Sequence, residues 1–169
     1  MEIKRDAPGL GDAISAEDMG KFPDVDIAAA LQHVPGITVS RASNGTQTGI
    51  TVRGFGPQFN QTLQDGRKAS SASGRTFDFS TVGADFVSRV DVNKTPDASL
   101  SSGAIGATVN IIYPKPFDHP GFRLVGSAST TATDNLGQPL PNADILISDT
   151  FDGDRFGILI GGAYSSVRT

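Results

Sequence analysis

The sequence contains no cysteine and no tryptophan among its 169 residues. Without cysteine, a disulfide framework and a thiolate metal site are both excluded. No apolar run approaches the roughly 20 residues that a membrane-spanning helix needs. Residues 1–10 also lack the apolar segment of a signal peptide. We therefore expect either a cytosolic chain or one whose signal has been removed.

Charge and hydrophobicity are both low. Fourteen basic and 18 acidic residues give a net charge of −4, which offers no basic patch for nucleic acid. Hydrophobic residues make up 37%, below the usual share of a globular domain, while Gly contributes 20 residues and Pro 10. This mixture favours many turns and short strands over a helical bundle.

Residue types that carry chemistry are scarce. The only histidines are His33 and His119, and neither lies in a pattern that looks like a nucleophile with an orienting carboxylate. Acidic residues are scattered without metal-ligand spacing. Gly54-Phe55-Gly56 is not followed by a helical pattern, which argues against a phosphate-binding loop. We expect no catalytic residue, no metal, no cofactor and no enzyme activity.

Periodicity predicts an α+β domain in the first two thirds of the chain. Ile27, Leu31 and Val34 fall on one face of a helix that Asp24 can cap and that runs to Gln32. The capping-box spacing of residues 15–18 predicts a short helical turn, and residues 96–100 another. Alternating apolar and polar residues predict strands at 37–40, 50–53, 62–64, 88–93 and 109–113, with an Asn-Gly turn at 44–45 and a Ser-rich loop at 69–74.

The sequence pattern changes after the Pro-Lys-Pro stretch that ends at residue 116. Three long runs follow, at residues 122–133, 143–151 and 155–167. The last carries Phe156, Ile158, Ile160 and Tyr164 on one face and small residues on the other. Asp152-Gly153 predicts a two-residue hairpin turn. By themselves, the runs suit a transmembrane β-barrel and the edge of a soluble sandwich equally well.

Five short segments occur in a fixed order. They read AAALQHVPG at 28–36, ITVRG at 50–54, LQDGR at 63–67, VSRVDVNKTP at 87–96 and GAIGATVNI at 103–111. In this order and spacing, residues 12–118 resemble the plug domain of TonB-dependent receptors, the energy-coupled importers of the Gram-negative outer membrane. GKFPDVD at 20–26 and TPDASL at 95–100 further resemble the branch of Caulobacter- and Xanthomonas-like bacteria, of which many members are linked to carbohydrate uptake.

The resemblance implies three parts of the chain. Residues 1–11 would be a disordered arm, 12–116 a small mixed-sheet plug domain with short helices, and 117–169 the first three antiparallel strands of an incomplete transmembrane β-barrel. The plug would fill the polar lumen of a large barrel. The turn at residues 152–153 would then be the first periplasmic turn.

The implied function is the gate of an outer-membrane transporter, with the plug in the barrel lumen and facing the periplasm. Its cargo would be a scarce solute, a carbohydrate or an iron chelate, and its partners a TonB-type energy-coupling protein and its own barrel. The family's coupling segment, an acidic-Thr-hydrophobic pattern, is not visible in residues 1–14. The alternatives are a free-standing periplasmic binding or adaptor module and a truncated fragment without function. Long strands with unpaired edges argue against the module, because such edges invite aggregation.

Two arginines match family positions that pair with glutamates of the barrel wall. Arg53 and Arg89 would form this plug–barrel ionic lock, with partners beyond residue 169. The alternative is two solvated arginines at strand edges.

Two further segments, 55–61 and 67–77, match the apical loops that touch the solute in the family. Phe55 and Phe59 could stack on a sugar ring, while Gln58, Asn60 and Arg67 could form hydrogen bonds to it. The alternative is a mobile loop with both aromatic rings packed inward.

Overall fold

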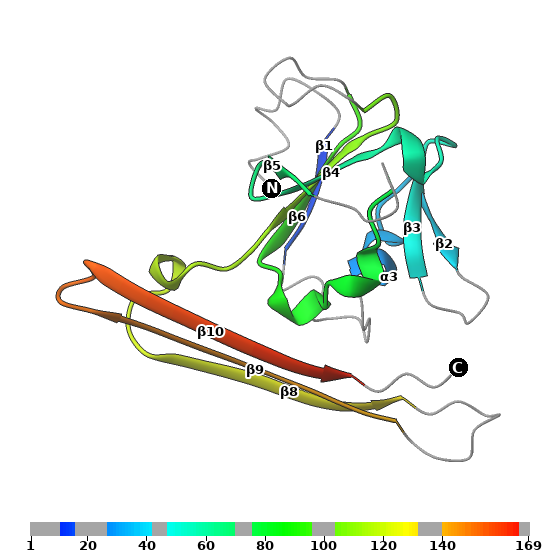
Figure 1. The fold of residues 1–169 in the computed structure, drawn as a ribbon. Helices are drawn as coiled ribbons and strands as arrows, with labels where there is room; N and C mark the ends of the chain where they lie inside the picture. Colours follow the sequence, from blue (N-terminus) through cyan, green and yellow to red (C-terminus); the bar gives the residue numbers. More distant parts are fainter. Residues whose placement is uncertain are drawn as a thin grey trace. The chain divides into compact units, whose positions relative to one another are not determined.

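The computed structural model describes residues 11–15, 27–41, 47–69, 76–95, 104–131 and 140–165 (Figure 1). The chain divides into two compact units, Met1–Tyr113 and Pro114–Thr169. None of the described helices combines the length and apolar character needed to cross a membrane.

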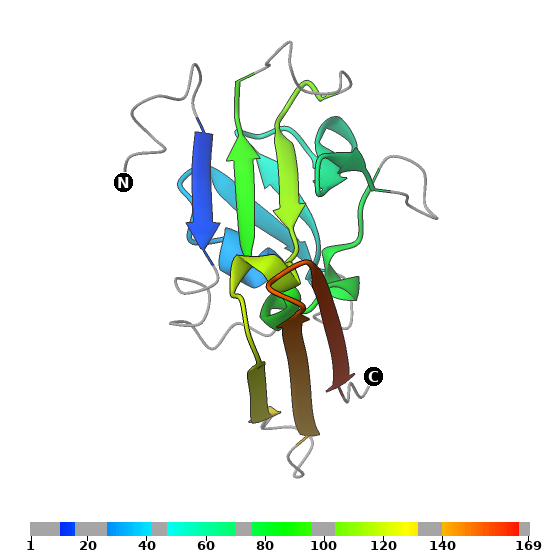
Figure 2. The ribbon, with the colours of Figure 1, turned by 90° about the vertical axis from the view of Figure 1, so that its left-hand side faces the viewer.

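The first unit contains a five-stranded mixed sheet in the order β1-β6-β7-β4-β5 (Figure 2). Its strands are β1 (Gly11–Ser15), β4 (Gln61–Gln64), β5 (Arg67–Lys68), β6 (Arg89–Asn93) and β7 (Thr108–Ile112). Only the β4–β7 pair is parallel among the pairings of this sheet. The sheet and its short helices confirm the predicted α+β fold with a mixed sheet.

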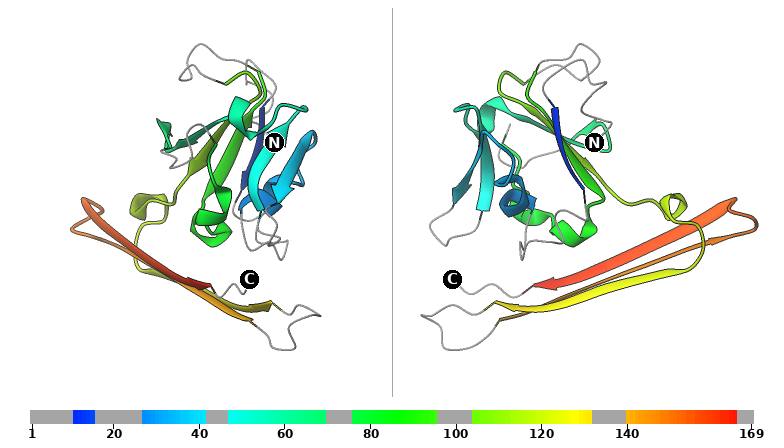
Figure 3. Two further views of the ribbon diagram at one scale, coloured as in Figure 1. Left: turned by 45° about the vertical axis from the view of Figure 1, so that its right-hand side comes forward. Right: turned by 180° about the vertical axis from the view of Figure 1, so that it is seen from behind.

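One face of this sheet forms the core of the unit. Val90 and Val92 on β6 lie opposite Ile111 and Val109 on β7, and all four side chains are fully buried. The opposing layer is the hairpin of β2 (Ile37–Arg41) and β3 (Gln47–Val52) together with helix α3 (Ile27–Leu31). Figure 3 shows this hairpin and α3 on one side of the five-stranded sheet. Apolar alternation on the strands and the i, i+4 pair on α3 account for this packing.

Short 3-10 helices connect these elements, and the sequence patterns did not predict them. They are η1 (Pro57–Phe59), η2 (Phe79–Thr81), η3 (Ala84–Phe86) and, in the second unit, η4 (Pro116–Asp118). Phe79 brings η2 into the core, where its ring makes an edge contact with Phe77 at 5.0 Å between centroids. Asp78 accepts a hydrogen bond from the Ser80 amide at 3.0 Å and so caps η2.

The second unit is a three-stranded antiparallel sheet in the order β10-β9-β8. Its strands, β8 (Arg123–Thr131), β9 (Leu140–Phe151) and β10 (Phe156–Ser165), fall within or overlap the three predicted runs. The predicted two-residue hairpin turn is wrong, because Phe156 lies opposite Phe151 and residues 152–155 all belong to the connection. Asp152 and Asp154 both adopt positive φ, and Thr150 Oγ1 donates to Asp154 at 2.7 Å, which stabilises the longer turn.

The N-terminal predictions need correction where the chain is described. Gly11, expected in a disordered arm, begins β1 and lies opposite Asn93. Ser15, expected to cap a helical turn, ends the same strand, because the pairing with β6 outweighs the local capping signal. Several predictions fall on parts of the chain outside the described residues. These parts are residues 1–10, 16–18 and 24–26, the turn at 44–45, most of the Ser-rich loop and the turn at 96–100.

Candidate functional site

Phe55 and Phe59 lie on the surface of the connection between β3 and β4. The chain leaves β3 through Arg53 and Gly54, which have φ values of 52° and 80°. The two rings then meet edge to face with centroids 6.2 Å apart, and each side chain is 41% exposed. Gln58, on η1 between them, is also exposed. This region therefore presents an aromatic surface with one amide beside it.

Ile105 extends this apolar surface, and the sequence patterns did not identify it. Its side chain is 68% exposed, and its amide donates to the Phe59 carbonyl at 3.0 Å. The contact joins two loops that are far apart in the sequence, so no local pattern could have placed Ile105 beside Phe59.

Asn60 does not join this surface. The side chain is only 7% exposed, and its Nδ2 donates to the Ile50 carbonyl at 2.9 Å. The predicted ligand contact is corrected to a structural role, because the amide nitrogen holds β3 against the start of β4. Gly106 leaves the room that this buried amide needs, since a Cβ there would overlap Asn60 Oδ1.

Arg67 is separated from the two phenylalanines by the length of β4. Arg67 is exposed and lies on β5, where it pairs with Gln64 at the end of β4. Helix η1, which carries Phe59, instead precedes Gln61 at the start of β4. Gln61 and Gln64 lie about 10 Å apart along the strand. The two segments expected to share one site thus lie at opposite ends of β4, and residues 70–75 of the second segment lie outside the described part of the chain.

Arg53 is exposed but anchored from two sides. Its amide donates to the Gly36 carbonyl at 2.9 Å, and its Nη1 donates to the Lys94 carbonyl at 3.0 Å. Lys94 is 8% exposed, and its Nζ donates to Asp12 Oδ2 and to the Pro35 carbonyl, each at 2.6 Å. A buried ammonium needs such partners, because an unpaired charge is costly away from water.

Arg89 has a looser environment at the start of β6. Its Nε lies 2.9 Å from Asp91 Oδ1, with 43% and 27% of the two side chains exposed. The buried Nε forms no hydrogen bond, so its contact with Asp91 is an ion pair only. Arg53 bonds to the residue just after β6, so the two predicted lock residues lie at opposite ends of that strand.

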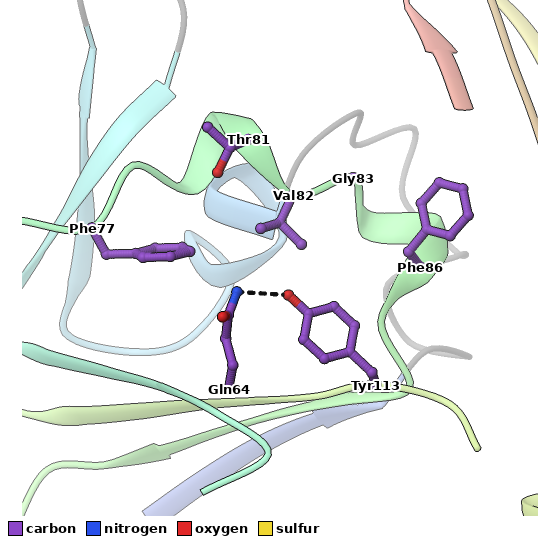
Figure 4. A pocket seen from close by; sticks show the side chains of 7 residues that line it. All are labelled: Gln64, Phe77, Thr81, Val82, Gly83, Phe86 and Tyr113. Carbon is purple, nitrogen blue, oxygen red and sulfur yellow. Dashed lines mark hydrogen bonds between the residues drawn. The ribbon is translucent and has the colours of Figure 1, made fainter. Parts of the chain in front are cut away.

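An open hollow of about 440 Å³ lies beside the ends of β4 and β7 (Figure 4). Phe77, Val82 and Phe86 supply apolar walls, and Gln64 Nε2 donates to the Tyr113 hydroxyl at 2.9 Å. Burial raises the pKa of the Tyr113 phenol above its ordinary value of 10.0, the Gln64 hydrogen bond lowers it, and the Asp65 carboxylate raises it. The hydroxyl is therefore neutral at physiological pH.

We expect the Tyr113 phenol to titrate above pH 10, which phenolate absorbance of the Tyr164→Phe chain would measure. Asp65→Asn should lower the titration midpoint and Gln64→Leu should raise it, because these side chains act in opposite directions. Because the pKa of Tyr113 is higher in the folded state than in the unfolded state, the protonated phenol contributes stability at pH values below the unfolded-state pKa. That contribution is lost as the pH rises through the folded-state pKa. Alkaline pH should thus destabilise the fold. A Tyr113 midpoint below 10 would contradict this account.

One face of the three-stranded sheet is mostly apolar, and it also carries Asp149, which lies opposite Ile158. Leu124, Ile147 and Ile160 lie in one row across the three strands, and each is at least 40% exposed. Phe151 lies opposite Phe156 at one end of this face, and Tyr164 lies near the other. The eight residue steps from Phe156 to Tyr164 span about 26 Å along the strand. At the 35–45° tilt of transmembrane barrel strands this length covers roughly 20 Å of the ~25 Å apolar band that aromatic girdles flank.

The opposite face of this sheet carries more polar groups. Ser127 Oγ bonds to the Asp144 carboxylate, and Ser148 is buried. Helix η4 covers one end of this face: a Cβ added to Gly157 would lie 2.6 Å from Pro116 Cβ. One face thus suits lipid and the other a polar interior.

A plug-like mixed-sheet unit followed by long two-faced antiparallel strands defines the class of outer-membrane receptors. The chain belongs to the TonB-dependent Receptor Plug Domain family, whose model matches residues 3–108. It is 34% identical over 142 residues to the ferric enterobactin receptor PirA of Pseudomonas aeruginosa, covering 75% of this chain and 18% of that protein. It is 30% identical over 125 residues to the ferrienterobactin receptor of Escherichia coli, covering 64% and 17%.

Solved structures agree with this membership. The siderophore receptor PirA of Pseudomonas aeruginosa matches at 30% identity with a TM-score of 0.61, covering 86% of this chain and 25% of that chain. The siderophore receptor PirA of Acinetobacter baumannii, at 24% identity, shows the same fold with a TM-score of 0.77 over 96% of this chain and 25% of that one.

These relatives confirm the predicted TonB-dependent receptor plug and its place in the outer membrane. They are receptors rather than enzymes. They do not confirm the Caulobacter- and Xanthomonas-like branch, since the matches include proteins of Pseudomonas, Vibrio and Escherichia. The chain spans about 18% of the length of the curated relatives that it matches.

Proposed function

We propose that this chain is the plug and the first three wall strands of a transporter that imports an iron chelate across the outer membrane. The observation that carries the proposal is the two-faced sheet directly after a plug unit, because an apolar face about 26 Å long along a strand tilted by 35–45° covers roughly 20 Å of the ~25 Å apolar band of a barrel wall. We place the plug at residues 12–116 and the wall strands at 117–169. The partners are a TonB-type energy-coupling protein and the remaining barrel wall.

The iron chelate is favoured over a carbohydrate by the relatives' names. Three of them, at 34%, 33% and 30% identity, are receptors for ferric enterobactin. The exposed rings of Phe55 and Phe59, with Gln58 and Ile105 beside them, would offer a stacking surface to a chelate with aromatic ligands. Arg67 remains a separate candidate contact at the other end of β4, where its guanidinium would attract an anionic chelate.

A transport assay with the full-length receptor tests the proposal. Cells that depend on this receptor should take up radioactive iron as a ferric catecholate complex, and uptake should require the TonB system. Phe59→Ala should weaken binding of the complex without unfolding the receptor. The matched control is Phe117→Ala, since Phe117 is also exposed but lies in η4 of the other unit. Uptake of an oligosaccharide without any iron complex would overturn the iron proposal.

We further propose that Arg53 and Arg89 pair with carboxylates of the barrel wall. In the isolated 169-residue chain, Arg89→Ala should change the free energy of unfolding by about 0–1 kcal/mol, because its pair with Asp91 is partly exposed. Arg53→Ala should cost about 1 kcal/mol through loss of the hydrogen bond to the Lys94 carbonyl.

In the full-length receptor, each replacement should instead increase protease access to the plug. Denaturant unfolding of the chain and limited proteolysis of the receptor measure the two effects. If Arg89→Ala destabilised the isolated chain by several kcal/mol, Arg89 would be a structural residue of the plug and not part of a lock.

A further inference from the structure

Lys94 ties three separate parts of the plug together. Its buried Nζ donates to Asp12 of the N-terminal strand β1 and to the carbonyl of Pro35, in the turn after α3. Its own carbonyl accepts the hydrogen bond from Arg53 Nη1 at 3.0 Å. One residue therefore contacts β1, the α3 turn and the arginine proposed to face the barrel wall.

The same turn holds Arg53 from a second direction. The Arg53 amide donates to the carbonyl of Gly36, the neighbour of Pro35, at 2.9 Å. Arg53 also has a φ of 52°, a conformation that a residue with a side chain rarely adopts without support. The position of the Arg53 guanidinium thus depends on the Lys94 carbonyl and on a turn that the Lys94 ammonium holds.

Strand β1 is the element of this cluster that can be withdrawn most easily. It lies at the edge of the five-stranded sheet, beside β6 (Figure 2), and is five residues long. Edge strands with few pairing partners open at lower free energy than central strands. Asp12 lies opposite Val92, two residues before Lys94, so removing β1 removes the carboxylate from the buried ammonium.

We propose that Lys94 is a positioning residue that couples β1 to the guanidinium of Arg53. While β1 is paired, Asp12 neutralises Lys94, and the end of β6 holds Arg53 in place. When β1 leaves the sheet, Lys94 loses its counter-charge, the end of β6 rearranges, and Arg53 loses its carbonyl partner. Movement at the N-terminus thereby loosens a wall contact. This inference rests on the proposed function, which supplies the wall partner of Arg53.

Chemical modification of individual arginines tests the coupling in the 169-residue chain. Phenylglyoxal reacts with free guanidinium groups, and mass spectrometry reads the rate at Arg53 and Arg89 separately. Asp12→Asn, a change that does not touch Arg53, should raise the rate at Arg53 about fivefold, the effect expected for one lost hydrogen bond. Lys94→Met should do the same, and Asp12→Glu, which keeps the carboxylate, should restore a slow rate.

Asp91→Asn is the matched control, because Asp91 lies on the same strand and contacts Arg89. It should raise the rate at Arg89 and leave Arg53 unchanged, whereas Asp12→Asn should leave Arg89 unchanged. Amide exchange at Val109 and Ile111 in β7 reports whether the core stays folded.

An unchanged Arg53 rate in folded Asp12→Asn would overturn the proposal. So would loss of protection at Val109 and Ile111 in Asp12→Asn, because the ion pair would then act on global stability alone. The assay involves no transport, so its failure would leave the proposed import function intact. A failure of iron uptake would in turn leave the coupling between Asp12 and Arg53 measurable.

Discussion

Replacing Gly106 by alanine is expected to destabilise the plug by roughly 3 kcal/mol. A Cβ at this position would lie 2.8 Å from Phe55 Cβ and would overlap Asn60 Oδ1. Asn60 is buried and donates to the Ile50 carbonyl, so its displacement also breaks a buried hydrogen bond. Overpacking and loss of that bond act together, because the Asn60 amide that meets the new Cβ cannot move away without leaving the Ile50 carbonyl.

Gly83→Ala is the matched control for Gly106→Ala. A Cβ on Gly83 would meet only the Phe86 ring at 3.5 Å, an ordinary contact, and Gly83 has a φ of −67° that alanine adopts freely. Its free energy of unfolding should stay within about 0.5 kcal/mol of the parent or rise slightly. Denaturant unfolding of both variants makes the comparison, and equal midpoints would contradict the proposed packing around Asn60.

The second large effect is expected for Ile147→Lys in the full-length receptor. Ile147 lies in the apolar row with Leu124 and Ile160. It is midway along β9 between Ala143, which lies opposite Tyr164, and Phe151. In the proposed barrel wall that position lies near the middle of the bilayer, where a lysine on the lipid face costs about 2–4 kcal/mol. We expect reduced insertion into vesicles and a lower unfolding free energy in the membrane.

Leu146→Lys provides the comparison, because Leu146 is the next residue on β9 and points to the opposite face. Its cross-strand neighbours are Val125 and Gly161, and the same face carries Asp144 and Ser148. Lysine there should be tolerated in a polar lumen. If the two lysine variants were equally impaired, the assignment of lipid and lumen faces would be wrong.

Elements with a strong local pattern could be predicted from the sequence. The alternation of apolar with polar residues around Val90 and Val92, and around Val109 and Ile111, identified the central strands of the first unit. The three long runs identified β8, β9 and β10 as well. Strand β1 was missed, because Gly11–Ser15 holds little apolar alternation and is stabilised by pairing with residues about 80 positions away.

The candidate site was predicted less well, because long-range contacts determine it. Nothing local to Asn60 shows that Ile50 and Gly106 will bury it. Ile105 joins Phe59 only through the tertiary fold. Arg67 was grouped with Phe55 because both segments match the apical loops of the family, yet β4 separates them. Sequence patterns indicate which residues are polar or aromatic, whereas packing determines which of them share a surface.

The most direct test of the account is a labelling scan of β9 in the full-length receptor in lipid vesicles. The 169 residues contain no cysteine, so single cysteines can be introduced at residues 143–148 without competing thiols from this segment. We predict that a lipid-soluble maleimide labels 143, 145 and 147, while a water-soluble one labels 144, 146 and 148. Equal labelling of all six positions by the water-soluble reagent would contradict the claim that these strands begin the wall of a membrane barrel.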